Sequence, residues 1–488
     1  MNKTNEPYII LPLNFTRHTE DHMLLVNLVG EYLYLPNNDF NQLINYSLDQ
    51  DSDIFSNLKA KHFITKNLSD PAIELLAIKY RTKKEFLSDF TSLHMFVITL
   101  RCNQNCVYCH ASSKAVGKKA LDMSMETALK AVDITLMSPS KYIKIEFQGG
   151  EPLLNFDTIK YIIEYANDQA LLKNKKLEFV VCTNLTLATD EMLKYLVSNN
   201  ILLSISLDGP GHVHDFNRHY RDGSGSYEDV IRALDKAKEY IKPENISALM
   251  TTTKYSLNFA DEIVDEYIKN GFRSIFVRAL NPFGYALSKM DEIGYSPSGF
   301  IDFYKRILDY IIKINQQGIY MEESFTSLLL RRMLTSFSTG FVDIQFPAGT
   351  GISGVIYNYD GNVYPADEAR MLAQMGDGRF CMGNVHNNTY KELFYNNALQ
   401  EIIGNTCAES LPGCSDCAFQ MYCGIDPIRN YVTQGDIVGH RPTNDSCLIH
   451  KEIIKYLFEI ILENDPYYMD VFWSWLTGRR LSEIKVTV

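Results

Sequence analysis

Between residues 93 and 320 the chain alternates short apolar runs with amphipathic stretches that repeat apolar residues at the i, i+3, i+4 and i+7 positions of a helix. Six such strand-and-helix pairs in succession predict a parallel sheet with right-handed crossovers. Six pairs are too few for a closed eight-stranded barrel, so we expect an α/β partial barrel, (βα)6, with its site at the carboxyl ends of the strands. The predicted strands are 93–100, 142–148, 177–183, 202–208, 246–253 and 274–280, and the predicted helices are 125–137, 158–172, 191–200, 227–241, 260–270 and 300–314.

The segments on either side of the predicted barrel have other patterns. Two strand-like runs around Gly30 and a helix from Asn38 to Tyr46 predict an α+β module at the N-terminus. The segment after the barrel is rich in Gly, Asn, Asp and Cys, which predicts loops, and the C-terminal tail has the pattern of a core-packing amphipathic helix. The expected regions are therefore an N-terminal module (1–90), a barrel (91–325), a loop-rich module (340–450) and a helical tail (451–488).

Composition narrows the class of protein. The chain is 46% hydrophobic and 22% charged, as in globular proteins, and its net charge of -12 is spread without long runs. Nucleic-acid binding would require a basic face, so we expect no nucleic-acid partner. No apolar run reaches the ~20 residues of a membrane span, and the N-terminus lacks a signal-peptide pattern. We therefore expect a cytoplasmic protein with no membrane partner.

Three cysteines, Cys102, Cys106 and Cys109, follow the first predicted strand in the pattern C-x3-C-x2-C. Thiolates at this spacing converge on a soft metal centre, either zinc or an iron–sulfur cluster. A structural zinc would need a fourth ligand. The adjacent His110 is a candidate, although a residue next to Cys109 points away from it unless the backbone folds back sharply. On a four-iron cluster, three ligands leave one iron open to a cofactor or substrate.

This cysteine pattern, followed by Q-G-G-E-P-L at residues 148–153, resembles the radical SAM superfamily. The resemblance implies that the open iron binds S-adenosylmethionine, which is cleaved to methionine and a 5'-deoxyadenosyl radical that abstracts a substrate hydrogen. The resemblance also implies that residues at the ends of successive strands contact the cofactor. For the GGEP element, the alternative is a plain β-turn with no cofactor contact. The expected cofactor-binding residues are Tyr108, Gly149, Gly150, Glu151, Pro152, Thr183, Asn184, Ser206, Asp208, Arg218 and Arg278.

Three of these residues have specific expectations. Glu151 can accept a hydrogen bond from the ammonium group of the cofactor. Arg218 matches an arginine that the related enzymes place near the cofactor carboxylate or the substrate, and a solvated surface arginine is the alternative. Arg278 comes from a buried strand, where an unpaired arginine is not expected.

A second group of cysteines lies near the C-terminus, in the pattern C-x2-C-x5-C followed by one more cysteine after a gap. An ordinary zinc site is the alternative to a cluster. The pattern resembles the SPASM domain, whose seven cysteines serve two auxiliary 4Fe-4S clusters. Phe346 and Ala366 stand where the family has cysteines, and the cysteine expected soon after Cys423 is absent, so the resemblance implies one auxiliary cluster and two 4Fe-4S clusters in all. Its expected ligands are Cys414, Cys417, Cys423 and Cys447.

The cysteines outside the two groups, Cys182, Cys381 and Cys407, are expected to be small buried hydrophobes. Two carboxylates have a candidate catalytic role. Asp367 matches a position where the related sulfatase-maturating enzymes have a carboxylate that acts as a base, and Glu368 is its rival; Arg218 completes the candidate catalytic set.

Almost the whole chain resembles the His-Xaa-Ser system radical SAM maturases of the HxsB type, through segments such as IKIEFQGGEPLLNF and LPGCSDCAFQMYCGIDPIRNY. This implies a peptide-modifying enzyme that acts on a precursor with His-Xaa-Ser repeats, beside a second radical SAM maturase and an electron donor such as flavodoxin or ferredoxin. The N-terminal module is similar to modules that add a leader peptide to a strand edge, and a plain cap on the barrel is the alternative. The alternative functions are a sulfatase-type maturase and a non-catalytic, zinc-stabilised peptide-binding scaffold.

Overall fold

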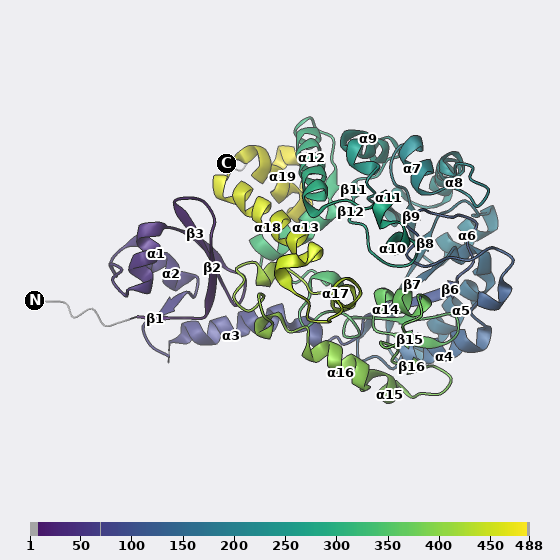
Figure 1. Ribbon diagram of the computed structural model, residues 1–488, viewed down its shortest axis with the longest axis horizontal. Coiled ribbons are helices and arrows are strands. Elements are labelled where there is room, and N and C mark those ends of the chain that lie inside the picture. Colours follow the sequence, from purple (N-terminus) through teal and green to yellow (C-terminus); the bar gives the residue numbers. More distant parts are fainter. Residues whose placement is uncertain (1–7, 69, 486–488) are drawn as a thin grey trace, which may run out of the picture.

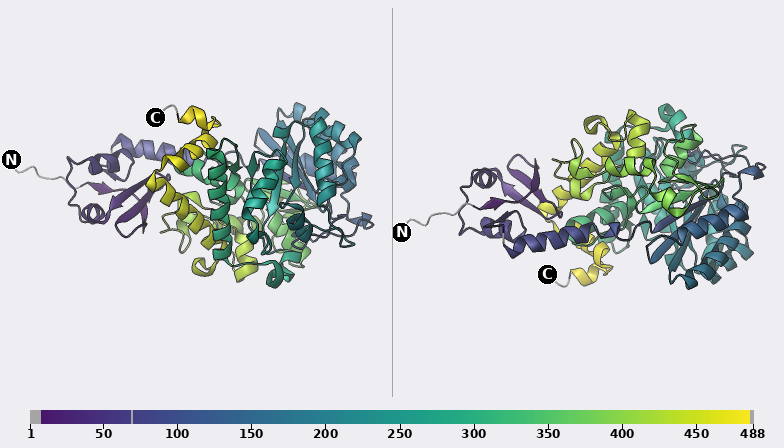
Figure 2. Two further views of the ribbon diagram at one scale, coloured as in Figure 1. Left: turned by 90° about the horizontal axis from the view of Figure 1, so that it is seen from above. Right: turned by 90° about the horizontal axis from the view of Figure 1, so that it is seen from below.

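The computed structural model describes residues 8–68 and 70–485. The N-terminal module lies at one end of the molecule and the partial barrel at the other, with the C-terminal segments between them (Figure 1). Helix α3 (Pro71–Lys83) runs from the module toward the rest of the molecule, and the views from above and below show the same arrangement (Figure 2).

The N-terminal module is built on a three-stranded antiparallel sheet in the order β2-β3-β4. Strands β3 (His22–Asn27) and β4 (Tyr32–Pro36) form the predicted hairpin, and Gly30 in the turn has a φ of +77°, which favours glycine. The sequence pattern did not predict β2 (Leu13–Arg17), which forms one edge of the sheet. The other elements of the module are β1 (Ile9–Ile10), α1 (Asn37–Ile44), α2 (Asp53–Ala60) and β5 (Ile64–Thr65).

The central sheet has nine strands in the order β12-β10-β9-β8-β7-β6-β14-β15-β16. Six of them, from β6 to β12 by way of β7, β8, β9 and β10, pair in parallel with their neighbours. Parallel pairing requires crossover connections, and helices supply them here. The predicted α/β partial barrel is therefore confirmed. Its strands are β6 (Leu93–Thr99), β7 (Tyr142–Gly149), β8 (Lys176–Thr183), β9 (Leu202–Ser206), β10 (Ile246–Thr251) and β12 (Val277–Arg278).

Local sequence signals explain where the barrel helices begin and end. The Ser124 hydroxyl accepts the amide of Thr127 at the start of α4, which satisfies a helix donor that has no partner within the helix. Gly271, just after α9, has a φ of +78°, as glycine often does where a helix ends. The helices of this region are α4 (Met125–Thr135), α5 (Phe156–Leu172), α6 (Asp190–Ser198), α7 (Gly211–Asn217), α8 (Tyr227–Tyr240), α9 (Ala260–Lys269), α10 (Tyr285–Ser288), α11 (Met290–Ile293) and α12 (Pro297–Gln316).

Both edges of the sheet differ from the simple six-strand prediction. The sixth strand is divided: β11 (Ser274–Ile275) pairs with β13 (Glu322–Glu323), whereas β12 pairs with β10. At the opposite edge, β14 (Gly354–Tyr357) pairs in parallel with β6, and β15 (Asn362–Tyr364) and β16 (Gly383–Asn384) follow in antiparallel pairing. The loop-rich segment thus extends the barrel sheet.

The core joins the parts of the chain. In β3, Leu24 and Val26 are buried in the same large apolar core as Leu457 of the predicted tail helix, whereas Leu25 faces a smaller core of the N-terminal module. Among the helices that the structure describes, none has both the length and the hydropathy needed to cross a membrane. The C-terminal helices are α13 (Ser324–Leu334), α14 (Asp367–Gln374), α15 (Tyr390–Phe394), α16 (Asn397–Gly404), α17 (Pro427–Gln434), α18 (Asp445–Glu463), α19 (Pro466–Thr477) and α20 (Leu481–Ile484).

Candidate active site

The three-cysteine loop, with Cys102, Cys106 and Cys109, directly follows β6 at the carboxyl edge of the sheet. The sulfurs of Cys102 and Cys109 accept the backbone N–H groups of Gln104 and Ser113, each at 3.4 Å. Burial, and then the negative charge of the neighbouring thiolates, raises the pKa of Cys102, and burial raises the pKa of Cys106 to about 12. A bound metal centre would reverse these shifts and deprotonate the thiols.

A segment that follows α7 holds this loop in place. The amides of Asn105 and Val107 donate to the carbonyls of His219 and Asn217, at 2.8 and 2.9 Å. Arg221 donates from Nε to a carbonyl of the loop at 3.0 Å. This support could not be predicted from the sequence, because any residue type can supply a backbone carbonyl and no motif marks it.

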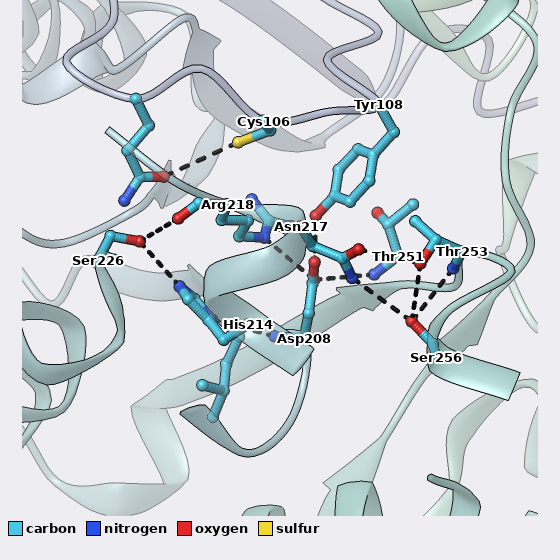
Figure 3. Close-up of polar contacts among 12 residues, drawn as sticks. Cys106, Tyr108, Asp208, His214, Asn217, Arg218, Ser226, Thr251, Thr253 and Ser256 are labelled. Carbon is cyan, nitrogen blue, oxygen red and sulfur yellow. Dashed lines mark hydrogen bonds and ion pairs between the residues drawn. The ribbon is translucent and has the colours of Figure 1, made fainter. Parts of the chain in front are cut away.

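Tyr108, Asp208 and Arg218 form a buried polar network beside the three-cysteine loop (Figure 3). The Tyr108 hydroxyl donates to Asp208 Oδ2 at 2.5 Å, and the backbone N–H of Thr251 donates to Oδ1 at 3.1 Å. Arg218 Nε lies 3.0 Å from Asp208 Oδ1 as an ion pair, and the guanidinium carbon lies 5.2 Å from the centre of the Tyr108 ring. The Arg218 side chain is only 10% exposed, so the surface-arginine alternative is wrong.

A second layer of buried groups supports this network. The hydroxyl of Ser226 donates a hydrogen bond to the Arg218 carbonyl. The same Ser226 Oγ lies 3.2 Å from His214 Nε2 (Figure 3). The amide of Asp208 donates to His214 Nδ1 at 3.4 Å. Burial lowers the pKa of His214 to about 4, so the imidazole is neutral and can accept this bond. No motif identified His214 or Ser226, although both lie close in sequence to Arg218.

The glycines of the GGEP element are required by the backbone of β6 and the loop that follows it. A Cβ atom on Gly149 would lie 2.2 Å from the carbonyl oxygen of Thr99, and one on Gly150 would lie 2.3 Å from that of Arg101. A larger residue at either position would push the end of β7 away from the three-cysteine loop. The backbone of β6 and of the loop after it therefore packs directly against both glycines.

Glu151 is fully buried at the junction of β7 and β8. Its carboxylate accepts the hydroxyl of Thr183 at 2.6 Å and the amides of Asn184 and Leu153 at 2.8 and 3.0 Å. Burial raises the pKa of Glu151 to about 7, opposed by these three hydrogen bonds. Pro152 then opens a short 3-10 turn. A contact of Glu151 with the ammonium group of a cofactor stays a prediction.

Asn184 links the end of β8 to the three-cysteine loop. Its side-chain amide donates to Asn103 Oδ1 at 2.9 Å and lies 3.9 Å from the sulfur of Cys102. Ser206 lies at the end of the next strand, β9, and is partly buried. The predicted residues Tyr108, Asn184, Asp208 and Arg218 are therefore gathered around the loop.

Arg278 differs from its expectation. Val277 takes the buried position of β12, and Arg278, on the opposite face, is exposed. Among the residues that the structure describes, Arg278 forms no ion pair. Its charge nevertheless lowers the pKa of His110, for which burial is the larger cause, and opposes the rise in the pKa of Glu368. The expectation of a buried, paired Arg278 is wrong, because the side chain belongs to the open face of the sheet edge.

The two candidate bases on α14 have different surroundings. Asp367 is paired with Arg370, whose side chain is 2% exposed, at 2.6 Å between Oδ1 and Nε. Glu368 accepts one hydrogen bond, from Asn281 Nδ2 at 3.1 Å. Burial, followed by the negative charge of Asp426 and other carboxylates, raises the pKa of Glu368 to about 8.

The C-terminal cysteines come together although they are spread over more than thirty residues of sequence. Arg441 donates from Nε to the sulfur of Cys414 at 3.1 Å, and the positive charge of Lys451 opposes the rise in the pKa of Cys417 that burial causes. Both cations favour thiolates, the form that binds metal. We call this site the four-cysteine cavity, because its lining includes Cys414, Cys417, Cys423 and Cys447.

The donor chemistry of both sites fits iron–sulfur clusters. The first site offers three thiols from one loop, and the second offers three thiols from a loop together with Cys447 of α18; a 4Fe-4S cluster takes thiolate ligands. Within the described parts of the chain, no group of three or more His, Cys, Asp or Glu side chains has the spacing to hold a single metal ion. The ligands of a cluster bind different irons, so they need not meet at one point.

Comparison with known proteins decides the family. Residues 96–265 match the model of the Radical SAM superfamily, from within β6 through the three-cysteine loop and into α9. The chain belongs to the radical SAM superfamily. It is therefore an enzyme, and the family implies S-adenosylmethionine and a 4Fe-4S cluster as cofactors. The non-catalytic scaffold alternative is set aside.

Relatives of this radical SAM enzyme include a protein named as a sulfatase-maturating enzyme and one named as a cyclopropyl synthase. An uncharacterised protein of Methanocaldococcus jannaschii is 32% identical over 225 residues, which cover 46% of this chain and 72% of the relative. A cysteine-type anaerobic sulfatase-maturating enzyme of Clostridium perfringens is 25% identical over 369 residues, covering 73% and 93%. The radical SAM cyclopropyl synthase TigE of Paramaledivibacter caminithermalis is 26% identical over 345 residues, covering 66% and 67%.

Solved structures share the fold. The radical SAM enzyme is similar to anSMEcpe with bound AdoMet, with a TM-score of 0.64 and 21% identity over 79% of this chain and 98% of that one. It is also similar to Streptococcus suis SuiB bound to the precursor peptide SuiA, with a TM-score of 0.55 and 14% identity over 89% and 99%. The second comparison covers more of this chain than the first.

Proposed function

We propose that this radical SAM enzyme modifies a residue of a ribosomally made precursor peptide with His-Xaa-Ser repeats. The observation that carries the proposal is an open strand edge in the N-terminal module with an apolar groove beside it. A relative named as a sulfatase-maturating enzyme, and the similarity to SuiB bound to its precursor peptide, support a protein or peptide substrate.

The groove lies between β2 and α1. Phe15 on β2 and Ile44 on α1 are 49% and 47% exposed, so both sides of the groove present apolar surface. Among the strands that the structure describes, β2 pairs with β3 alone, so its other edge has no strand partner there. A peptide bound there would place alternate side chains toward the groove. The groove is lined by Ile10, Leu11, Pro12, Leu13, Phe15, Phe40, Leu43 and Ile44.

The same strand contacts the auxiliary cysteine site. Asn14 of β2 donates from its side-chain amide to the carbonyls of Ser415 and Cys417, each at 3.1 Å. These two hydrogen bonds join β2 to the loop that carries Cys414 and Cys417. This proximity supports a peptide-recognition role for the module over a plain cap.

In this proposal Cys102, Cys106 and Cys109 hold the radical SAM cluster. When bound, the cluster and S-adenosylmethionine supply the radical that abstracts hydrogen from the substrate. Asp208 fixes both Tyr108 and Arg218, and Arg218 favours a thiolate at Cys106 because its positive charge opposes the rise in pKa caused by burial.

We also propose an auxiliary 4Fe-4S cluster in the four-cysteine cavity, which makes two clusters in the enzyme. Arg441 and Lys451 would offset part of its negative charge. An electron donor such as flavodoxin or ferredoxin and a second radical SAM maturase complete the proposed partners.

For proton removal from the substrate we propose Glu368 over Asp367. Asp367 is held by an ion pair with a buried arginine, so its carboxylate already has a fixed partner. Glu368 has a raised pKa, near the operating range that a general base needs. Arg278, exposed and without an ion-pair partner in the described chain, is proposed to contact the cofactor or substrate.

Iron analysis of anaerobically reconstituted enzyme tests the two-cluster proposal. We expect about eight irons per chain, and about four after joint replacement of Cys102, Cys106 and Cys109 by Ala. That variant should form no 5'-deoxyadenosine. Replacement of Cys414, Cys417 and Cys423 by Ala is the matched control, which should remove the other four irons. Four irons in the unaltered enzyme would rule out the auxiliary cluster.

Mass spectrometry of the precursor peptide after anaerobic reaction tests the substrate. A mass loss of two hydrogens would indicate a crosslink or an oxidation, and an unchanged mass with a changed stereocentre would indicate epimerisation. Phe15→Glu in the groove should weaken peptide binding at least tenfold, whereas Arg17→Glu, on the same strand but outside the groove lining, should not. Equal binding by both variants would argue against the groove.

A sulfatase-type maturase is the second candidate. The alignment with the cysteine-type enzyme of Clostridium perfringens covers 93% of that relative, which favours this reading. Incubation with a peptide containing a sulfatase-type cysteine distinguishes the two. Conversion of that peptide, with no change in the His-Xaa-Ser precursor, would favour the second candidate.

A further inference from the structure

A small cavity lies where the end of α3 meets the segment that follows α13. It shares no lining residue with the four-cysteine cavity, and the mechanism proposed above does not use it. Its walls come from parts of the chain that are distant in sequence: Lys83, Lys84, Phe86, Arg332, Phe337, Ser338, Thr339, Gly340, Gln345, Phe346 and Met421.

Three of these lining residues are cations, and two of them have only neutral partners. Lys83 Nζ donates to the carbonyl of Thr335 at 3.2 Å. Arg332 donates from Nη2 to the carbonyl of Met421 at 2.7 Å, and from Nη1 to another backbone carbonyl. Carbonyl oxygens satisfy these hydrogen bonds but do not neutralise the charges.

The third cation, Lys84, forms an ion pair with a carboxylate. Its Nζ lies 2.8 Å from Glu409 Oε1, an oxygen that also accepts the hydroxyl of Tyr80 at 2.9 Å. The next carboxylate that acts on the cluster, Glu31, is 2.5 Å from Lys79, outside the cavity. Within the described chain, the three cations therefore share one carboxylate partner. Thiolate charge at Cys423 and Cys407 also acts on Arg332 and Lys84.

The surroundings of the cations agree with this imbalance. Burial, and then the charge of Arg332, lowers the pKa of Lys83 to about 8. The carbonyl end of α13 favours a cation near Thr335, but a helix terminus carries only about half a unit of charge and cannot offset three cations.

The size of the cavity limits what can bind. The space inside it that a water-sized sphere can occupy is about 30 Å³. A cavity needs roughly 10–15 Å³ of such space to hold one water molecule. There is room for a group of a few heavy atoms, such as a carboxylate or a phosphate, but not for a nucleotide. The hydroxyl-bearing Ser338 and Thr339 add hydrogen-bond donors that suit the oxygens of such a group.

We propose that Lys83, Lys84 and Arg332 form a binding site for a small oxyanion, either a free phosphate-type ion or the carboxylate of an acidic peptide side chain. Cationic side chains that are held in place before binding recognise such groups through charge-assisted hydrogen bonds. The site does not depend on the proposed modification reaction, because binding can be measured without turnover.

Titration calorimetry of the anaerobically reconstituted full-length enzyme with inorganic phosphate tests the proposal. We expect saturable binding that weakens about tenfold in Lys83→Gln and in Arg332→Gln, which is ~1.4 kcal/mol for each. The matched control is Arg331→Gln, next in sequence but not part of the cavity lining, and it should bind phosphate as the unaltered enzyme does. Because Arg332 supports two backbone carbonyls, Lys83→Gln keeps the test valid if Arg332→Gln fails to fold.

Competition distinguishes the two sources of the anion. If N-acetyl-aspartate amide displaces phosphate, the natural ligand is a peptide carboxylate, and if it does not, the site takes a free oxyanion. Absence of saturable phosphate binding would overturn the proposal, as would equal binding by the Lys83→Gln and Arg331→Gln variants.

Discussion

Asp208 connects three parts of the active site through one buried carboxylate. It accepts from Tyr108 of the three-cysteine loop and from the backbone at the end of β10, and it balances the charge of Arg218. Removing one member of a buried ion pair leaves the other charge uncompensated, which is far more costly than losing a surface pair.

We predict that Asp208→Asn destabilises the folded enzyme by about 3–5 kcal/mol and abolishes cleavage of S-adenosylmethionine. Urea unfolding and 5'-deoxyadenosine formation measure the two effects. Asp222→Asn, in an exposed loop of the same region, is the control and should change neither. Unchanged stability of Asp208→Asn would mean that Arg218 does not need its partner.

The raised pKa of Glu368 predicts a pH dependence of product formation. Only the ionised carboxylate can accept a proton, and with a pKa of about 8 only about a tenth is ionised at pH 7. The rate of product formation should therefore rise as the pH increases through 8, and Glu368→Gln should remove both the product and this dependence. Formation of 5'-deoxyadenosine should persist in the variant. If Asp367→Asn removed the dependence and Glu368→Gln kept it, Asp367 would be the base.

At the residue scale, the sequence predicted which side chains belong to the candidate sites better than it predicted their burial and their partners. The cysteine spacing identified both groups of thiols, because cysteines a few residues apart in one loop also lie near each other in the fold. The exposure of Arg278 and the ion pair of Asp367 could not be predicted, because they depend on which face of β12 is open and on a buried arginine of α14. Cys182 also differs from the expected buried hydrophobe: it is partly exposed and donates to Glu146 at 3.3 Å.

At the scale of elements, the close contact of β7 with the end of β6 fixes the geometry of the site. We predict that Gly150→Ala destabilises the enzyme by about 1–3 kcal/mol and lowers the iron content of the three-cysteine site, because its Cβ would lie 2.3 Å from a carbonyl oxygen. Thermal unfolding and iron analysis measure these effects. Gly117→Ala, which would meet nothing within 4 Å, is the control. Equal stability of the two variants would contradict the contact.

Long periodic elements were predicted well. Short strands were either missed, as β16 was, or predicted as one longer strand, as at 274–280, which the structure divides into β11 and β12. The barrel helices have capped ends and repeated apolar positions, which identify a helix from local sequence. Strands β11, β12 and β16 have two residues each, too few for a periodic signal. The pairing of β14 with β6 joins residues about 260 apart, and only tertiary contacts determine it.

At the scale of the whole molecule, the N-terminal module and the rest of the chain share a core. Tyr422 donates its hydroxyl to the carbonyl of Gly30 at 2.8 Å, and Tyr34 donates to the carbonyl of Phe458 at 2.7 Å. Leu24 and Val26 complete this contact on the side of the module. The parts of the chain are therefore expected to fold together.

We predict that a protein lacking residues 1–90 aggregates, because the deletion uncovers the apolar surface around Tyr422 and Phe458 and leaves buried polar groups without partners. Size-exclusion chromatography and iron analysis of the purified fragment measure this. A monomeric fragment that still binds the auxiliary cluster would show that the shared core is dispensable.

The short strands at both ends of the central sheet determine where another chain can join the enzyme. The sheet ends in β12 and β16, and each offers only two residues of backbone for pairing. Short edges of this kind are poor templates for added strands. The five-residue edge of β2 is a longer template with an apolar groove beside it. In the proposed binding mode, an extended peptide would pair with the main chain of β2 outside the barrel, and the segment that enters the active site would not pair with the central sheet.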